Sequence, residues 1–295
     1  MLFLVDASVY VFRAYYSMPP DMADRAGNPT HATFGFARFL GDLIERAQPQ
    51  YLAVAFDESL TSSFRNRLYP PYKANRDPAP ADLLWQFARC REFCEFAGVR
   101  HFSSNEFEAD DIIGTLATRA RAAGLPVTVV TRDKDMAQLV RAGDVYWDYA
   151  ANERFRYQDI EERFGCAPER FVDYLALTGD SVDNIPGVPG IGKKTAAELL
   201  RAFESLDHLY ENLERVPLLK LRGASSVAAK LREHREAAYL AQRLTRITID
   251  MPFSESLEDL RPRAPDADGL QGFLDRQGFG GLLRRQAQRI AAQSL

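Results

Sequence analysis

The sequence has 295 residues, of which 46% are hydrophobic and 26% charged, and its formal net charge at pH 7 is −4. This composition excludes a disordered or low-complexity protein and fits a globular chain with one or two domains. No apolar run reaches about 18 residues, which excludes a membrane-spanning helix.

Short apolar segments that end in acidic residues alternate with helix-period segments in the first half of the chain. We expect strands at 2–5, 51–56, 127–131 and 144–149, and helices at 31–47, 81–97 and 108–123. This alternation predicts a parallel α/β sheet.

The strand signals stop near residue 155, and helices separated by Gly/Pro turns follow. These helices are expected at 158–164, 168–177, 192–203, 205–213 and 223–247. We therefore expect an α/β core in residues 1–155, a helical region in 156–250, and a surface-packed or mobile tail without a motif in 251–295.

One segment, residues 58–80, has no helix or strand period throughout. Two tyrosines are interleaved with its four basic residues: Arg65, Arg67, Tyr69, Tyr72, Lys73 and Arg76. A long solvated loop is one interpretation. The other is a segment that binds single-stranded nucleic acid, with cations on phosphates and rings stacked on bases, and loops of this length are usually functional or disordered.

Acidic residues follow the predicted strands at positions that would meet at one edge of the sheet. Strand ends supply Asp6, Asp57, Asp133 and Asp135, and the helix start FEADD supplies Glu108, Asp110 and Asp111, where capping alone could also explain the acids. Gathered carboxylates need cations to neutralise them, and an all-oxygen ligand set favours Mg²⁺. The histidines lie elsewhere in the sequence, which argues against zinc.

The cysteines Cys90, Cys94 and Cys166 are too few for a disulfide framework and favour a reducing cytoplasm. Cys90 and Cys94 lie four residues apart on a predicted helix. A metal-binding pair is conceivable there, but buried thiols are the commoner arrangement and we favour them.

The stretch TGDSVDNIPGVPGIGKKTA, residues 178–196, combines two aspartates, a Gly/Pro turn and two lysines. A phosphate-binding P-loop requires Ser or Thr directly after the lysine, whereas Thr195 follows Lys194 and no strand precedes the glycines. The pattern instead favours a helix–hairpin–helix, in which glycines allow close approach and free N–H groups hold a phosphate.

Several motifs, taken together and in order, resemble a known family. They are LVDAS at 4–8, FDE at 56–58, SFR at 63–65, YKANR at 72–76, EADD at 108–111, DKD at 133–135, LTGDSVDNIPGVPGIGKKTA at 177–196 and RGASSVAAKL at 222–231. They resemble the 5′ nuclease (5′→3′ exonuclease) domain of bacterial DNA polymerase I, in the flap endonuclease superfamily, over roughly residues 1–250. No polymerase follows, so we expect a free-standing member. Ala7 and Arg132 depart from the family pattern without removing an acidic residue.

The resemblance implies a fold and a set of site residues. The fold is α/β, a PIN-like parallel-sheet core with a helical arch at about 58–80, followed by a helical region whose helix–hairpin–helix spans about 178–203. The implied metal ligands are Asp6, Asp57, Glu108, Asp110, Asp111, Asp133, Asp135, Asp180 and Asp183. The implied catalytic cations are Lys73 and Arg76, and the implied DNA contacts are Arg13, Arg65, Tyr72, Gly187, Gly190, Gly192, Lys193 and Lys194.

The implied activity is hydrolysis of DNA phosphodiesters near 5′ single-strand/duplex junctions, as in DNA replication and repair. The implied cofactors are two or more Mg²⁺ ions, with Mn²⁺ as a substitute, and K⁺ at the hairpin carbonyls. We expect a monomer that works in the cytoplasm on DNA with a 5′ flap, overhang or nick and has no membrane partner. A non-catalytic DNA-junction binder and an RNA-directed PIN-like nuclease are the alternatives.

Overall fold

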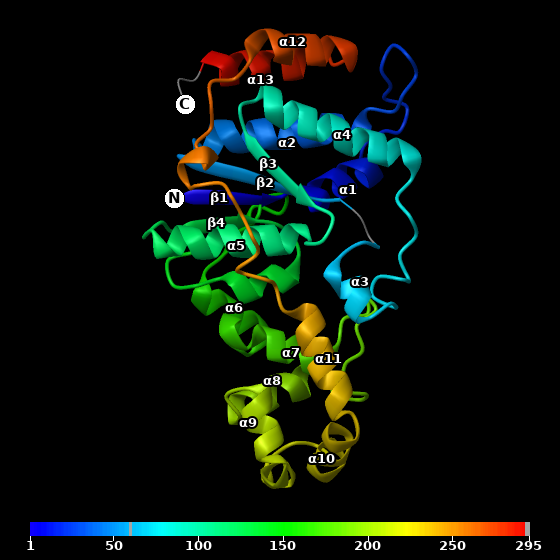
Figure 1. Ribbon diagram of the computed structural model, residues 1–295, viewed down its shortest axis with the longest axis vertical. Helices are drawn as coiled ribbons and strands as arrows, with labels where there is room; N and C mark the ends of the chain where they lie inside the picture. The colour runs from blue at the N-terminus through cyan, green and yellow to red at the C-terminus, as the bar shows by residue number, and fades with distance from the viewer. Residues whose placement is uncertain (59–60, 293–295) are drawn as a thin grey trace.

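The structure is a computed structural model that describes residues 1–58 and 61–292. Residues 59–60 of the expected arch and residues 293–295 of the expected tail lie outside the described residues. The molecule is elongated, with the sheet and its covering helices in one part and a smaller helical region at the opposite end (Figure 1). Within the described residues, no helix is both long and apolar enough to cross a membrane.

A six-stranded sheet, in the order β3-β2-β1-β4-β5-β6, forms the centre of the larger part. β1 to β5 are parallel and β6 is antiparallel to β5. The chain runs outward from β1 to β3 and then crosses to the other side of β1, so the strand order reverses between β1 and β4, where open α/β sheets bind ligands. The strands are β1 (Leu2–Asp6), β2 (Tyr51–Asp57), β3 (Arg100–Ser104), β4 (Val127–Val130), β5 (Val145–Asp148) and β6 (Glu153–Phe155).

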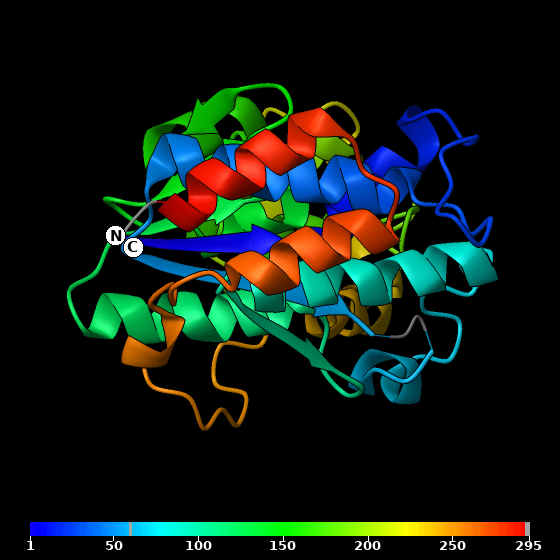
Figure 2. The same ribbon diagram turned by 90° about the horizontal axis from the view of Figure 1, so that it is seen from above.

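Helices cover both faces of the sheet, as the apolar strands require. Along β2, Val54 and Phe56 join the core formed with α1, α2 and α4, whereas Ala53 and Ala55 join the core formed with α5. Figure 2 shows these layers from above. The helices of this part are α1 (Ala7–Ser17), α2 (His31–Ala47), α3 (Phe64–Leu68), α4 (Ala81–Phe96) and α5 (Ala109–Ala122).

The smaller region packs against the α5 face of the sheet and shares its core. Leu4 and Ile113 belong to the same buried cluster as Leu199 and Leu231. A continuous apolar core therefore crosses the expected division at residues 155 and 156, and this boundary stays a prediction. The helices are α6 (Tyr157–Phe164), α7 (Phe171–Thr178), α8 (Lys193–Ala202), α9 (Leu206–Glu211), α10 (Ala224–Glu233) and α11 (Arg235–Thr245).

The C-terminal segment takes the surface-packed form, one of the two that were expected, and it contains α12 (Ala267–Arg276) and α13 (Gly281–Ala292). α12 packs on α4 and α13 on α2, as a further layer outside the sheet (Figure 1). The contact is close at Gly41 of α2, where an added Cβ would lie 2.6 Å from the side-chain carbon of Gln286.

The C-terminal helices contribute to stability through buried aromatic contacts. Phe273 of α12 is fully buried and its ring contacts those of Phe93, Phe96 and Phe279. We expect Phe273→Ala to lower the free energy of unfolding by about 3–5 kcal/mol, because it removes a large ring and leaves a cavity. Leu282→Ala, on exposed surface of α13, should change it by less than about 0.5 kcal/mol. Urea unfolding of both variants measures this; equal midpoints would show that α12 is not part of the folded core.

Candidate active site

Acidic side chains converge at the carboxyl edge of the sheet, next to the reversal in strand order. Asp6 ends β1 and Asp57 ends β2, while Asp133 follows β4 and Glu108 is the N-cap of α5. Burial first, and then the nearby carboxylates of Asp57 and Asp133, raise the pKa of Asp6 to about 8. Acids far apart in sequence thus interact electrostatically at one place.

Local hydrogen bonds orient these acids. The Thr131 hydroxyl donates to Asp6 Oδ2 over 2.8 Å, and the Ala109 N–H donates to Asp57 Oδ1 over 2.9 Å. Asp133 caps the 3₁₀ turn that follows β4, accepting from the Asp135 N–H over 2.9 Å. Each carboxylate therefore uses one oxygen for local structure and keeps acceptor capacity for a further partner.

Four further acids join these. They are Asp110, Asp135, Asp180 and Asp183, of which Asp180 raises the pKa of Asp135 and Asp183 raises that of Asp133. Burial raises the pKa of Asp110 well above its usual value, and Asp133, Asp6, Asp57 and Glu108 raise it further. Burial and then Asp133 raise the pKa of Asp135 to about 8. Such shifts arise where desolvated acids repel one another, and cations relieve the repulsion. We call the set the carboxylate cluster: Asp6, Asp57, Glu108, Asp110, Asp133, Asp135, Asp180 and Asp183.

Lysine and arginine side chains from other segments neutralise part of the carboxylate cluster. Lys73 Nζ lies 2.9 Å from Glu108 Oε1, Lys134 Nζ lies 2.6 Å from Asp180 Oδ2, and Arg76 forms an ion pair with Asp183. Burial would lower the pKa of Lys73, but Glu108 and Asp183 raise it overall, so the lysine stays charged.

Backbone contacts dock the arch beside the loop that carries Asp180 and Asp183. The Lys73 N–H donates to the Asp183 carbonyl over 3.0 Å, and the Asn184 side chain donates to the Pro71 carbonyl over 2.7 Å. Lys73 itself has φ of 55°, in the left-handed region that non-glycine residues seldom occupy. Both the cations and the backbone therefore hold the arch against the acids.

The carboxylate cluster suits a hard divalent cation in its chemistry. Its donors are all oxygen, and burial with mutual repulsion raises the pKa values of Asp6, Asp110 and Asp135. Among the described residues, however, no group of three or more His, Cys, Asp or Glu side chains is close enough to hold a metal. The acids instead form ion pairs with Lys73, Arg76 and Lys134. Divalent ions bound here would replace these cations.

Three residues expected at the site are buried in this arrangement. Asp111 forms a two-pronged ion pair with Arg65, at 2.7 and 2.8 Å, and Arg65 is only 2% exposed. The Tyr72 hydroxyl donates to Glu108 Oε2 over 2.9 Å and the residue is 3% exposed. A direct DNA contact by Arg65 or base stacking by Tyr72 is therefore not supported by this conformation. Arg13, in contrast, is exposed on α1.

The glycines of the hairpin (residues 187–194) have different surroundings. A Cβ on Gly187 would lie 2.3 Å from the Gly179 nitrogen, so protein packing requires this glycine. Gly190 has φ of 79°, in the left-handed region that favours glycine. Gly192 is the N-cap of α8 and faces open space. The exposed N-terminus of α8, with Lys193 and Lys194, is thus the part that can receive an anion.

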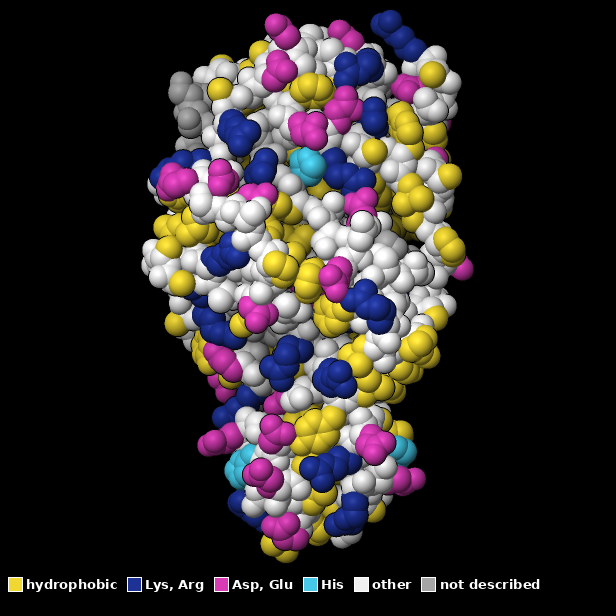
Figure 3. Space-filling view, in the orientation of Figure 1, with side chains coloured by type: hydrophobic (Ala, Val, Ile, Leu, Met, Phe, Trp, Pro, Cys, Tyr) yellow, Lys and Arg dark blue, Asp and Glu magenta, His cyan; other side chains and the backbone are white. Residues whose placement is uncertain are grey.

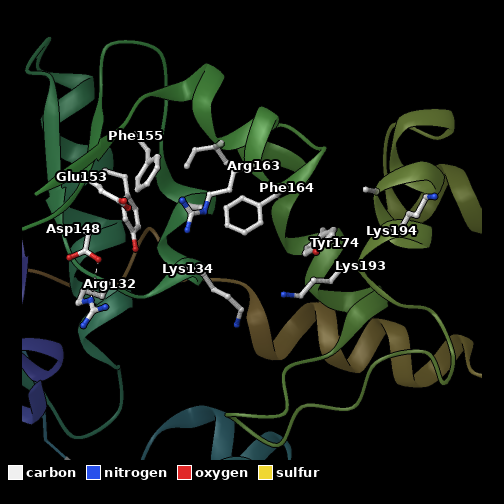
Figure 4. A pocket seen from close by; sticks show the side chains of 14 residues that line it. Arg132, Lys134, Asp148, Glu153, Phe155, Arg163, Phe164, Tyr174, Lys193 and Lys194 are labelled. Atoms are coloured by element: carbon white, nitrogen blue, oxygen red, sulfur yellow. Dashed lines mark hydrogen bonds and ion pairs between the residues drawn. The ribbon is translucent and has the colours of Figure 1, made fainter. Parts of the chain in front are cut away.

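A cleft of about 700 Å³ lies between this helix terminus and the sheet, and its edge reaches Lys134. Figure 4 shows Arg132 and Lys134 after β4, Arg163 of α6 and Lys193 of α8 around it, together with the acids Asp148 and Glu153. Basic and acidic side chains are interspersed on the face drawn in Figure 3. The cleft is lined by five basic side chains and two acids, so its own charge is positive although the net charge of the chain is −4.

Sequence reasoning missed three residues of this region: Thr131, Lys134 and Arg163. Lys134 lies inside the DKD motif, and a cation between two acids was a visible signal for it. Thr131 was expected only as a strand end, and Arg163 only as part of a helix. Neither position carries a pattern that indicates contact with the site.

Comparison with known proteins places this geometry in a family. The family "5'-3' exonuclease, N-terminal resolvase-like domain" matches residues 1–165, and "5'-3' exonuclease, C-terminal SAM fold" matches residues 166–268. The 5'-3' exonuclease of Buchnera aphidicola is 32% identical over 257 residues, covering 87% of this chain and 90% of that protein. DNA polymerase I of Pseudomonas aeruginosa is 40% identical over 270 residues.

Coverage and fold agree with that assignment. The match covers 91% of this chain but 29% of the Pseudomonas polymerase, so the chain spans about a third of its polymerase relatives. The bacteriophage T5 D15 flap endonuclease, solved with DNA and metal ions, has the same fold, with a TM-score of 0.66, 19% identity and 99% coverage of both chains. The chain belongs to the 5′-3′ exonuclease family.

Proposed function

We propose that this protein hydrolyses DNA phosphodiesters near junctions between a 5′ single strand and a duplex, as a divalent-metal-dependent 5′ nuclease. The observation that carries the proposal is the carboxylate cluster at the strand-order reversal, whose acids are buried or half-buried and, at Asp6 and Asp110, raise one another's pKa. Divalent cations held there, Mg²⁺ by preference, would activate water and stabilise charge on the phosphate. Asp6, Asp57, Glu108, Asp110, Asp133, Asp135, Asp180 and Asp183 would hold them.

The arch cations would change partners during the reaction. In the free protein Lys73 neutralises Glu108 and Arg76 neutralises Asp183. When metal ions neutralise those acids, the same cations become available to the scissile phosphate, where they would stabilise developing negative charge. Metal loading and substrate engagement would thus be coupled through one set of ion pairs.

The basic cleft would seat the duplex backbone. The N-terminus of α8, with Lys193 and Lys194, would hold one phosphate, and the cleft continues from there to Lys134 at the carboxylate cluster. Such contacts are independent of base sequence, which suits an enzyme that recognises junction shape. K⁺ at the hairpin carbonyls, a monomeric state and action in the cytoplasm are further parts of this proposal.

Cleavage itself provides the first test. We expect the purified protein with Mg²⁺ to cut a 5′-flapped DNA, and Asp133→Ala to be slower by more than about 100-fold, since losing even an outer partner of a metal ligand costs about 10- to 100-fold. Asp268→Ala, an exposed acid on α12, should cleave normally. Gel-resolved cleavage of matched DNA and RNA flaps measures this. Binding without cleavage in both Mg²⁺ and Mn²⁺ would favour the non-catalytic junction binder, and preference for the RNA flap the RNA-directed nuclease.

The ion-pair exchange predicts that removing an arch cation tightens metal binding in the absence of DNA. Lys73→Met leaves Glu108 unneutralised, so Mn²⁺ should bind the free protein more tightly by about tenfold, the scale of one charge acting over a few ångströms. Its kcat on flap DNA should nevertheless fall by about 100-fold or more. Titration calorimetry measures the affinity, with Lys220→Met, an exposed lysine without a charged partner among the described residues, as control. Weaker Mn²⁺ binding by Lys73→Met would contradict the exchange.

The proposed duplex seat predicts a change in salt dependence. Replacing both Lys193 and Lys194 by Gln should weaken DNA binding and reduce the slope of log K against log salt by about 0.9 for each phosphate that the protein no longer neutralises. Arg201→Gln, at the other end of α8, should leave the slope unchanged. Fluorescence anisotropy in Ca²⁺ at several KCl concentrations checks this, and an unaltered slope in the double variant would remove these lysines from the interface.

A further inference from the structure

A buried ion pair links the base of the arch to the start of α5. Arg65 lies on α3, and its guanidinium donates to both oxygens of Asp111 over 2.7 and 2.8 Å. Its Nε donates to the Leu244 carbonyl over 2.8 Å and a terminal nitrogen donates to the Arg246 carbonyl over 2.9 Å. With 2% of the residue exposed, no face of this cation is left for a DNA phosphate.

Both carboxylate oxygens of Asp111 also accept hydrogen bonds from protein groups. One oxygen accepts from the Thr248 N–H over 2.8 Å as well as from Arg65, and the other accepts from the Glu108 N–H over 3.0 Å as well as from Arg65. The side chain is fully buried. A metal ion bound to either oxygen would displace charge-assisted hydrogen bonds and leave the Arg65 charge buried without its partner, which costs several kcal/mol.

We propose that Arg65 and Asp111 are positioning residues for the carboxylate cluster, and that neither contacts DNA or metal. This rests on the function proposed above and changes two expected roles, one DNA contact and one metal ligand. The pair joins three segments: the arch through α3, the acidic start of α5, and residues 244–248, which lead back from the helical region. The metal-binding acids of α5 are then Glu108 and Asp110.

The geometry gives a route by which the pair acts. Asp111 accepts from the backbone of Glu108 in a reciprocal capping box, and this fixes the backbone from which the Glu108 side chain reaches Lys73 and Tyr72. Arg65 also lies 3.5 Å from Glu108 Oε2. A displaced Arg65 would therefore move one cluster acid and the arch residues bonded to it.

A buried ion pair is weak support for stability, because the cost of desolvation offsets the attraction. Its forked geometry, in contrast, defines direction: two parallel hydrogen bonds fix both the plane and the distance of the carboxylate. A lysine would keep the charge and lose the fork. Arg65→Lys therefore separates geometry from charge.

The test compares Arg65→Lys with Arg119→Lys. Arg119 is a matched control because it also binds backbone carbonyls, those of Phe253 and Glu255, but from the far end of α5. We expect Arg65→Lys to lower kcat on flap DNA and to weaken Mn²⁺ binding to the free protein, each by about 10- to 100-fold. DNA affinity in Ca²⁺ should not change, and Arg119→Lys should match the wild type in all three.

DNA affinity and Mn²⁺ binding together distinguish a positioning role from direct contact with DNA or metal. A loss of DNA affinity with normal Mn²⁺ binding would make Arg65 a DNA contact and overturn the proposal. Asp111→Asn should keep the Mn²⁺ stoichiometry of the wild type at lower affinity, whereas loss of one bound ion would make Asp111 a ligand. Thermal melts confirm that each protein is folded at the assay temperature, and Asp111→Asn decides the case if Arg65→Lys does not fold. If the wild type cuts no flap DNA, the proposed function fails, while the Mn²⁺ measurements still decide the role of the pair.

Discussion

Repulsion among buried carboxylates is the constraint on which the rest of this structure depends. A parallel sheet places the ends of its strands at one edge, and here those ends are acidic. The cost of holding them together appears as raised pKa values for Asp6, Asp110 and Asp135. The arch brings Lys73 and Arg76 to this edge, and Lys134 pairs with Asp180, which the 180–184 loop adds to the acids.

The cations that neutralise these acids differ in how many bonds hold them in place. Arg65 is buried and bonded on all sides, so its charge belongs to the folded framework. Lys134 and Arg76 are partly exposed. Lys134 pairs with Asp135 and Asp180, and Arg76 pairs with Asp183; substrate and metal ions could replace these partners. The site thus combines a fixed support, Arg65, with cations that have fewer bonds to the folded framework.

Much of this could be predicted from the sequence, and the failures have physical causes. Strands β1, β2 and β4 were predicted because they are apolar and buried on both faces. β3 was missed because the segment RHFSS is polar and only half-buried. Helix α12 was not predicted because Gly269 and Gly272 weaken the helix signal of a short segment, although the helix itself is continuous. The burial of Arg65 was unpredictable, since it depends on Asp111 and on carbonyls about 180 residues away.

The core shared by the α5 face of the sheet and the helical region has a consequence for where DNA would be cut. Leu4 beneath the carboxylate cluster and Leu199 of α8 lie in one continuous packed interior, and packed interiors resist compression. The separation between the helix terminus that would hold a phosphate and the acids that would hold metal is then a rigid length. The cleavage position would then be set by the fixed distance between the phosphate contact and the metal-binding acids, independently of the base sequence.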